Sequence, residues 1–157
     1  FHWLLHWLAL VGLAIWLGGF TFYSGVVIPA LHEVLGSVET GYVTQQVTNT
    51  LNGIGVAAIL PWWMMAIVER RASPPRPTLL PRLRVGLVVL ISALLVFLII
   101  LHGVMDRRLE SGSLEGFYPL HRTYLIASTA QWVASLALIA VWVASSGPLP
   151  PRARQAV

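Results

Sequence analysis

Cysteine and lysine are both absent from this chain of 157 residues, and charged residues of any kind are few. Without cysteine the chain can form no disulfide, no zinc–thiolate site and no catalytic thiol. Only 10% of the residues are charged and 57% are hydrophobic, whereas soluble domains usually carry about 25% charged residues. This composition predicts a single integral membrane domain in contact with the lipid bilayer.

The familiar enzyme motifs are absent as well. The sequence contains no glycine-rich phosphate loop, no Gly-x-Ser-x-Gly turn and no His-Glu-x-x-His pair. No carboxylate falls in the centre of an apolar segment, so a proton relay through the membrane is not indicated. The net charge of +4 comes from ten arginines that flank apolar segments, which argues against nucleic acid as a partner. We therefore predict a protein that is not an enzyme.

Four apolar segments are long enough to cross a bilayer, which takes about 20 residues. The first is too long for the core of a signal peptide and is not followed by an Ala-x-Ala site, so we expect a retained helix. The sequence thus predicts an all-α fold, a four-helix transmembrane bundle over residues 1–146, followed by a Pro/Arg-rich tail over residues 147–157. The expected helices cover about 3–31, 43–68, 85–101 and 124–143.

The arginines indicate the orientation of the helices. Seven lie in the tail and in the segment between the second and third predicted helices, which share one side of the membrane, and three lie on the other side. By the positive-inside rule, both termini are predicted to be cytoplasmic in a bacterial inner membrane. Tryptophans near helix ends (Trp3, Trp7, Trp62 and Trp63) are typical of an aromatic belt at the membrane surface.

Two pairs of glycines in the first predicted helix are each seven residues apart: Gly12 with Gly19, and Gly18 with Gly25. This spacing places each pair on nearly one helix face, where small residues allow another helix to approach closely. The second predicted helix begins with the polar stretch "TQQVTNTLNG". These side chains either project into the outer aqueous layer or line a polar cavity in the bundle.

Three histidines fall at the outer ends of three different predicted helices: His32, His102 and His121. Neutral imidazole binds zinc, copper, iron and nickel, and three protein ligands would leave an open position on the metal. Asp106 follows His102 by four residues and shares its helix face if that helix continues, and Met105 could serve copper as a soft ligand. These residues are the candidate metal site, for copper or another transition metal, in metal handling or electron transfer.

Other interpretations of the same residues stay open. Two of the histidines could hold a haem iron axially, or all three could be unbound histidines that make hydrogen bonds at the membrane surface. The glycine faces also fit a structural or accessory subunit that packs against other membrane subunits or against a second copy of the chain. The polar stretch fits a small transporter. Gln131, inside the fourth predicted helix, is expected to hydrogen-bond across helices.

Three stretches carry a resemblance to known families. "LHWLALVGLAIWLGGFTFYSGVVIP" (residues 5–29), "EVLGSVETGYVTQQVTNTLNGIG" (residues 33–55) and "HRTYLIASTAQW" (residues 121–132) resemble small bacterial four-helix membrane proteins of unknown function. The first stretch also resembles, more weakly, the opening helix of the copper-resistance D family, through His6, Trp16, Gly18 and Gly19. The first resemblance implies the four-helix fold, and the second implies copper handling or uptake across the inner membrane.

Overall fold

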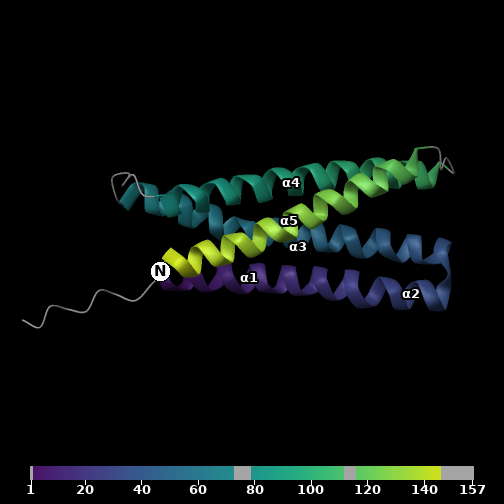
Figure 1. The fold of residues 1–157 in the computed structure, drawn as a ribbon, viewed down its shortest axis with the longest axis horizontal. Coiled ribbons are helices and arrows are strands. Elements are labelled where there is room, and N and C mark those ends of the chain that lie inside the picture. The colour runs from purple at the N-terminus through teal and green to yellow at the C-terminus, as the bar shows by residue number, and fades with distance from the viewer. Residues whose placement is uncertain (1, 73–78, 112–115, 146–157) are drawn as a thin grey trace, which may run out of the picture.

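The computed structural model describes residues 2–72, 79–111 and 116–145, so the predicted tail over residues 147–157 lies outside the described part of the chain. The chain forms four long helical spans, each antiparallel to the one before it, and all four are long and apolar enough to cross a membrane (Figure 1). The first span is made of α1 (His2–Phe22), a π-helical stretch η1 (Tyr23–Val27) and α2 (Ile28–Leu35). The others are α3 (Ser37–Ala72), α4 (Leu79–Glu110) and α5 (Phe117–Ser145). The prediction of a four-helix bundle of the membrane class is confirmed.

Each helix extends beyond the apolar segment that predicted it. The difference is largest for α4, which begins at Leu79 instead of 85 and ends at Glu110 instead of 101. Apolar runs mark only the part of a helix that faces the hydrocarbon core, about 30 Å thick, whereas the helices continue into the headgroup layers. As a consequence His102 and Asp106 lie on one continuous helix, as the candidate metal site requires.

The two ends of the bundle differ in the connections they carry. At one end α2 turns into α3 at Gly36, whose φ of 79° lies in the left-handed region that favours glycine. We call this the Gly36 end. At the opposite end, which we call the N-terminal end, α1 begins and α5 stops (Figure 1). The chain therefore starts and finishes its four spans on the same side.

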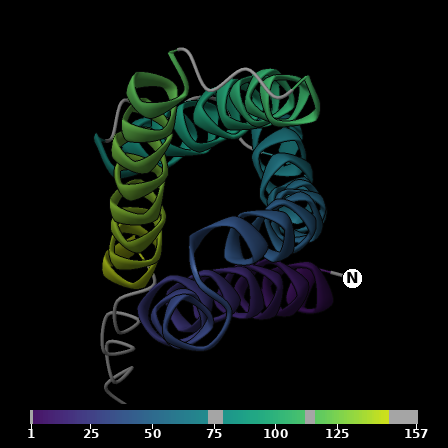
Figure 2. The same ribbon diagram turned by 90° about the vertical axis from the view of Figure 1, so that its right-hand side faces the viewer.

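The four spans pack around a square in the order α1, α3, α4, α5 (Figure 2). The closest backbone packing joins α4 to α5 and α1 to α3, and α3 contacts α4 less extensively. Contacts between α1 and α5 are few, and within the described residues neither η1 nor α2 approaches the backbone of α5. The reason is visible in Figure 1, where α5 lies near α4 at the Gly36 end and crosses to α1 at the N-terminal end. The seam between the first and last spans is therefore the weakest in the bundle.

One of the two predicted glycine faces forms the contact between α1 and α3. A Cβ atom at Gly12 would lie 3.4 Å from the Cα atom of Ala58, and a Cβ atom at Gly19 would lie 3.4 Å from a methyl carbon of Leu51. Gly18 and Gly25 have no such neighbour within 4 Å, so the prediction for this second pair is wrong for the single chain. The two pairs point in different directions around the helix, and α3 covers only one of them.

Two indole N–H groups donate hydrogen bonds across the interface between α1 and α3. Trp16 Nε1 donates to the carbonyl of Leu51 at 3.0 Å, and Trp62 Nε1 donates to the carbonyl of Ala9 at 3.1 Å. Trp62 is 1% exposed, so its predicted place in an aromatic belt is wrong, whereas Trp3 and Trp7 are exposed near the start of α1. A buried indole needs an acceptor for its N–H, and each close helix contact brings a backbone carbonyl within reach.

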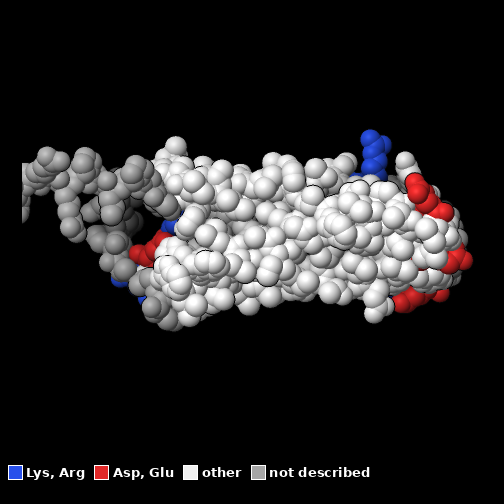
Figure 3. All heavy atoms as spheres, turned by 90° about the horizontal axis from the view of Figure 1, so that it is seen from below, with Lys and Arg blue, Asp and Glu red and all other residues white. Residues whose placement is uncertain are grey.

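Among the residues that the structure describes, charged side chains lie only toward the two ends of the bundle. The face seen in Figure 3 has a broad uncharged middle, with acidic side chains gathered at the Gly36 end. At the N-terminal end, Glu69 near the end of α3 forms an ion pair with Arg84 of α4. A charge-free middle bounded by charged ends is what a bilayer requires, because an ionised side chain in hydrocarbon is costly.

The packing of Gly55 against Trp16 gives a first prediction. A Cβ atom at Gly55 would lie 2.8 Å from Trp16 Nε1, and this buried indole cannot move aside without losing its hydrogen bond to Leu51. We expect Gly55→Ala to lower the free energy of unfolding in detergent micelles by about 1–3 kcal/mol. The matched control is Gly53→Ala, because a Cβ atom there meets nothing within 4 Å and alanine is the better helix former. Equal stability of the two variants would contradict the close approach.

Candidate functional site

A cavity of about 100 Å³ lies inside the half of the bundle nearer the Gly36 end. All four spans contribute to its walls, and the lining combines aromatic and aliphatic side chains with uncharged polar ones and two histidines. A cavity needs about 10–15 Å³ to hold one water molecule, so this cavity has room for several waters or for one small ring. Its polar and titratable lining residues are Tyr23, Ser24, Thr44, Thr48, Asn52, His102, His121, Tyr124, Ser128 and Gln131.

The π-helical stretch η1 places Tyr23 in the cavity wall. Pro29 follows η1 closely, and in a regular α-helix its ring would collide with the carbonyl of Gly25 and leave that carbonyl without a donor. The chain widens into a π turn over Tyr23–Val27 instead, and such turns occur often at functional sites. Tyr23 is the buried residue of this stretch, whereas Ser24 beside it is exposed and still lines the cavity.

The polar start of α3 divides between two faces of the helix. Thr44, Thr48 and Asn52 recur at every fourth position and line the cavity. Gln46 and Asn49 lie on the other face and are exposed. The alternative of a polar cavity wall is therefore borne out for one face of the helix, and projection of the other face into the outer aqueous layer stays a prediction.

His102 is held in place by two polar groups. Its side chain is buried, and Nε2 lies 3.3 Å from the carbonyl oxygen of Gln45 and 3.6 Å from Oδ1 of Asp106. The ring centre lies 5.8 Å from that of Tyr124 on α5. An N–H on Nε2 can be directed to the Gln45 carbonyl, which would leave Nδ1 as the free acceptor or metal ligand.

The other two candidate histidines have different surroundings. His121 lines the cavity and stacks on Phe117, with ring centres 6.0 Å apart. His32 is exposed on α2 and does not line the cavity. Among the described residues no group of three or more histidine or acidic side chains is placed to hold one metal ion. The structure thus brings His102, Asp106 and His121 to one region and leaves His32 outside it, and metal binding by these residues stays a prediction.

Two buried polar atoms of cavity-lining residues lack a hydrogen-bond partner: the hydroxyl of Tyr23 and Nδ2 of Asn52. The phenol of Tyr124 lies close enough to Asn52 to interact with it, although Nδ2 makes no hydrogen bond of normal geometry. A buried polar group without a partner costs about 1–3 kcal/mol. Sequence analysis missed Tyr23, because a tyrosine within an apolar run resembles an ordinary core residue, whereas Tyr124 lies one turn after the candidate ligand His121.

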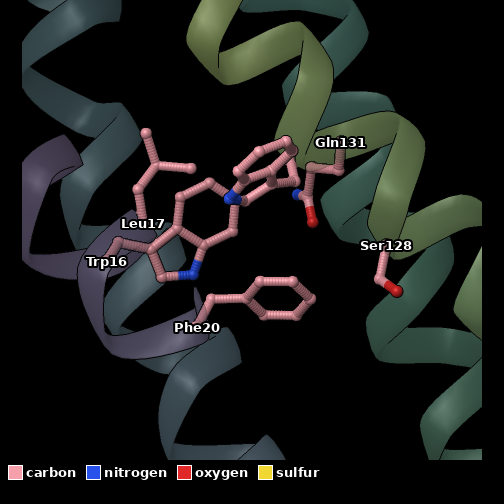
Figure 4. Close-up of a pocket in the computed structure, with 6 residues that line it drawn as sticks. Trp16, Leu17, Phe20, Ser128 and Gln131 are labelled. Atoms are coloured by element: carbon pink, nitrogen blue, oxygen red, sulfur yellow. The ribbon is translucent and has the colours of Figure 1, made fainter. Parts of the chain in front are cut away.

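A smaller hollow of about 10 Å³ lies beside the cavity, between α1 and α5. Figure 4 shows the rings of Trp16 and Phe20 extending from α1, with Ser128 and Gln131 across from them on α5. Gln131 Nε2 donates to the carbonyl of Ile91 on α4 at 3.3 Å, which confirms the predicted hydrogen bond across helices. Trp132 Nε1 donates to the hydroxyl of Thr21 at 3.0 Å and ties α5 to α1.

No protein-family model matches this chain, and the searches of curated proteins and of solved structures found no similar protein. The resemblances to small four-helix membrane proteins and to the copper-resistance D family therefore stay predictions, and function has to be argued from the cavity itself.

Proposed function

We propose that this protein binds a small ligand in the cavity near its Gly36 end, in a non-enzymatic role of binding or transfer within the membrane. The observation that supports this most is the pair of unpartnered polar atoms on Tyr23 and Asn52, two residues of the cavity wall. In a bundle surrounded by lipid such groups cannot be satisfied by bulk water, and their cost is offset when a ligand supplies the missing partner. Thr44 and Thr48, on the same helix face as Asn52, extend the polar wall.

This role can be tested by the retention of a ligand. We expect the protein, extracted from its native membranes into mild detergent, to carry a non-covalent small molecule in native mass spectra. Tyr23→Phe removes only the unpartnered hydroxyl and should lower the occupancy several-fold. Tyr42→Phe is the matched control, because Tyr42 is exposed and lies outside the cavity wall. Absence of any adduct from the natural protein, or equal occupancy in both variants, would contradict the proposal.

We further propose that the protein lies in a bacterial inner membrane with the Gly36 end outside and both termini in the cytoplasm. The support comes from the distribution of arginines in the sequence. Seven fall in the tail and between residues 69 and 84, and the four of these that the structure describes, Arg70, Arg71, Arg82 and Arg84, lie toward the N-terminal end, against three toward the Gly36 end. The cavity would then open toward the outer leaflet.

The absence of native cysteine makes this orientation simple to test. A cysteine at Val34, which is exposed at the Gly36 end, should react in spheroplasts with a maleimide that cannot cross membranes. A cysteine at Leu79, exposed at the N-terminal end, should react only after the cells are opened. The reverse pattern would show the opposite orientation.

A transition-metal ion, copper among them, is a second candidate ligand. It is favoured by the location of His102 and His121 on one cavity, with Met105 in the wall and Asp106 beside His102. Imidazole, carboxylate and thioether together suit a copper-like ion. Haem, held axially by the same two histidines, is a further ligand that this candidate includes.

Cobalt(II), whose visible absorption reports coordination by histidine, is a suitable probe of this second candidate. If the cavity binds metal, His121→Ala and His102→Ala should each weaken the binding of cobalt at least tenfold. His32→Ala is the control and should leave it unchanged, since His32 lies outside the cavity wall. A flat titration, together with no metal and no Soret band in the purified protein, would exclude both metal and haem.

A further inference from the structure

We propose that the cavity receives the ring of a lipid-soluble quinone, which reaches it from the bilayer through the seam between η1 and α5. This inference names the ligand class of the site proposed above and rests on that proposal. Four properties of the cavity lead to it: the position of its opening, the absence of charge, the kind of unpartnered atoms and the shape of the walls.

The exposed part of the cavity wall lies on the seam between η1 and α5. Ser24 on η1 and Leu125 on α5 both line the cavity, and both are exposed; Leu125 is 51% exposed. They lie on the seam where the backbones of η1 and α5 do not approach each other. At 1.5 Å per residue, Leu125 is about 12 Å from the start of α5, and Ser24 is about 17 Å from the end of α2. Both residues fall within the apolar segments of their spans, Ser24 in residues 3–31 and Leu125 in residues 124–143, so a molecule that uses this opening comes from the hydrocarbon region or its edge.

The cavity suits a neutral molecule. Its lining residues include no aspartate, glutamate, lysine or arginine. An ion that the two histidines do not ligate would lose its hydration there without gaining a counter-charge from the lining residues, which is unfavourable in a low-dielectric interior. This argues for an uncharged ligand that already dissolves in the bilayer.

The unpartnered atoms select for acceptor oxygens on the ligand. Asn52 Nδ2 can only donate a hydrogen bond, and the Tyr23 hydroxyl can donate one. They belong to different spans, so a ligand oxygen between them would bridge η1 and α3, and a carbonyl oxygen, with its two lone pairs, can accept from either donor or from both. Ring carbonyls supply such acceptors and carry no charge.

The walls suit a flat ring of limited size. Five residues with ring side chains line the cavity, namely Trp16, Phe20, His102, His121 and Tyr124, and aromatic groups pack best in offset or edge-to-face arrangements. With about 100 Å³ the cavity has room for a ring but not for a whole lipid. The tail of the molecule would therefore leave through the opening at Ser24 and Leu125 and remain among the lipids.

The experiment uses a decyl-substituted benzoquinone and the full chain in lipid nanodiscs. Quinones quench indole fluorescence, and Trp16 lies in the cavity wall. We expect saturable quenching by the natural protein. Asn52→Leu should weaken the affinity about tenfold, the equivalent of one buried hydrogen bond. Asn49→Leu changes the same residue type on the exposed face of α3 and should bind as the natural protein does.

Tyr23→Phe with its control Tyr42→Phe provides a second pair, which keeps the test valid if Asn52→Leu fails to fold. Excess decylbenzene, which has the ring and tail but no carbonyl, should not displace the quinone. Three results would overturn the inference: quenching that rises linearly without saturation, equal affinity in the cavity variants and their controls, or displacement by decylbenzene.

The two experiments together distinguish a wrong ligand class from the absence of any ligand site. If the natural protein retains an adduct that depends on Tyr23 but does not bind the quinone, only the ligand class is wrong. If it neither retains an adduct nor binds the quinone, the cavity is not a ligand site.

Discussion

The structure depends on one constraint: inside a bilayer, every polar group has to find its partner within the protein. The helices satisfy most of their own backbone groups, so the constraint falls on side chains. Trp16 and Trp62 meet it by donating to backbone carbonyls across the interface between α1 and α3, and Gln131 does so by donating to α4. Tyr23, Asn52 and Thr40 do not meet it, and the first two belong to the wall of the same cavity. That concentration of unmet hydrogen bonds is what separates this cavity from a packing defect.

Packing explains why the cavity lies in only one half of the bundle. At the N-terminal end α5 has crossed over to α1, and His6 and Trp142 bring their rings within 6.1 Å of each other. The same half holds side chains that are almost completely buried, among them Leu13, Trp62 and Leu138. Toward the Gly36 end α5 stays beside α4, and the π turn of η1 directs Tyr23 inward. The space left between the diverging spans is the cavity.

Much of the fold could be predicted from the sequence. The number of spans follows from the length of the apolar segments. The close contact of Gly12 and Gly19 with α3 follows from the spacing of these small residues on one helix face. The site could be predicted only in part. Topology correctly assigns His32, His102 and His121 to one end of the bundle, but that end is as wide as the bundle itself. Which way each histidine faces depends on helix rotation. The apolar residues of α5 are spread evenly around the helix, so its sequence predicts no preferred buried face. The rotation of α5 is set by its packing against α4.

The asymmetry of the bundle also bears on what the cavity can do. A passage across the membrane would need the closed half to open, and there the interface between α1 and α3 has little freedom: Gly12 lies against Ala58, and Trp62 is fixed by its hydrogen bond to Ala9. The seam between α1 and α5 has fewer contacts and is tied by the hydrogen bond from Trp132 to Thr21. A change of conformation would therefore begin at that seam, where the cavity already meets the lipid. The lining residues place the cavity in the half of the bundle nearer the Gly36 end, which favours binding and release within one leaflet over transfer from one side of the membrane to the other.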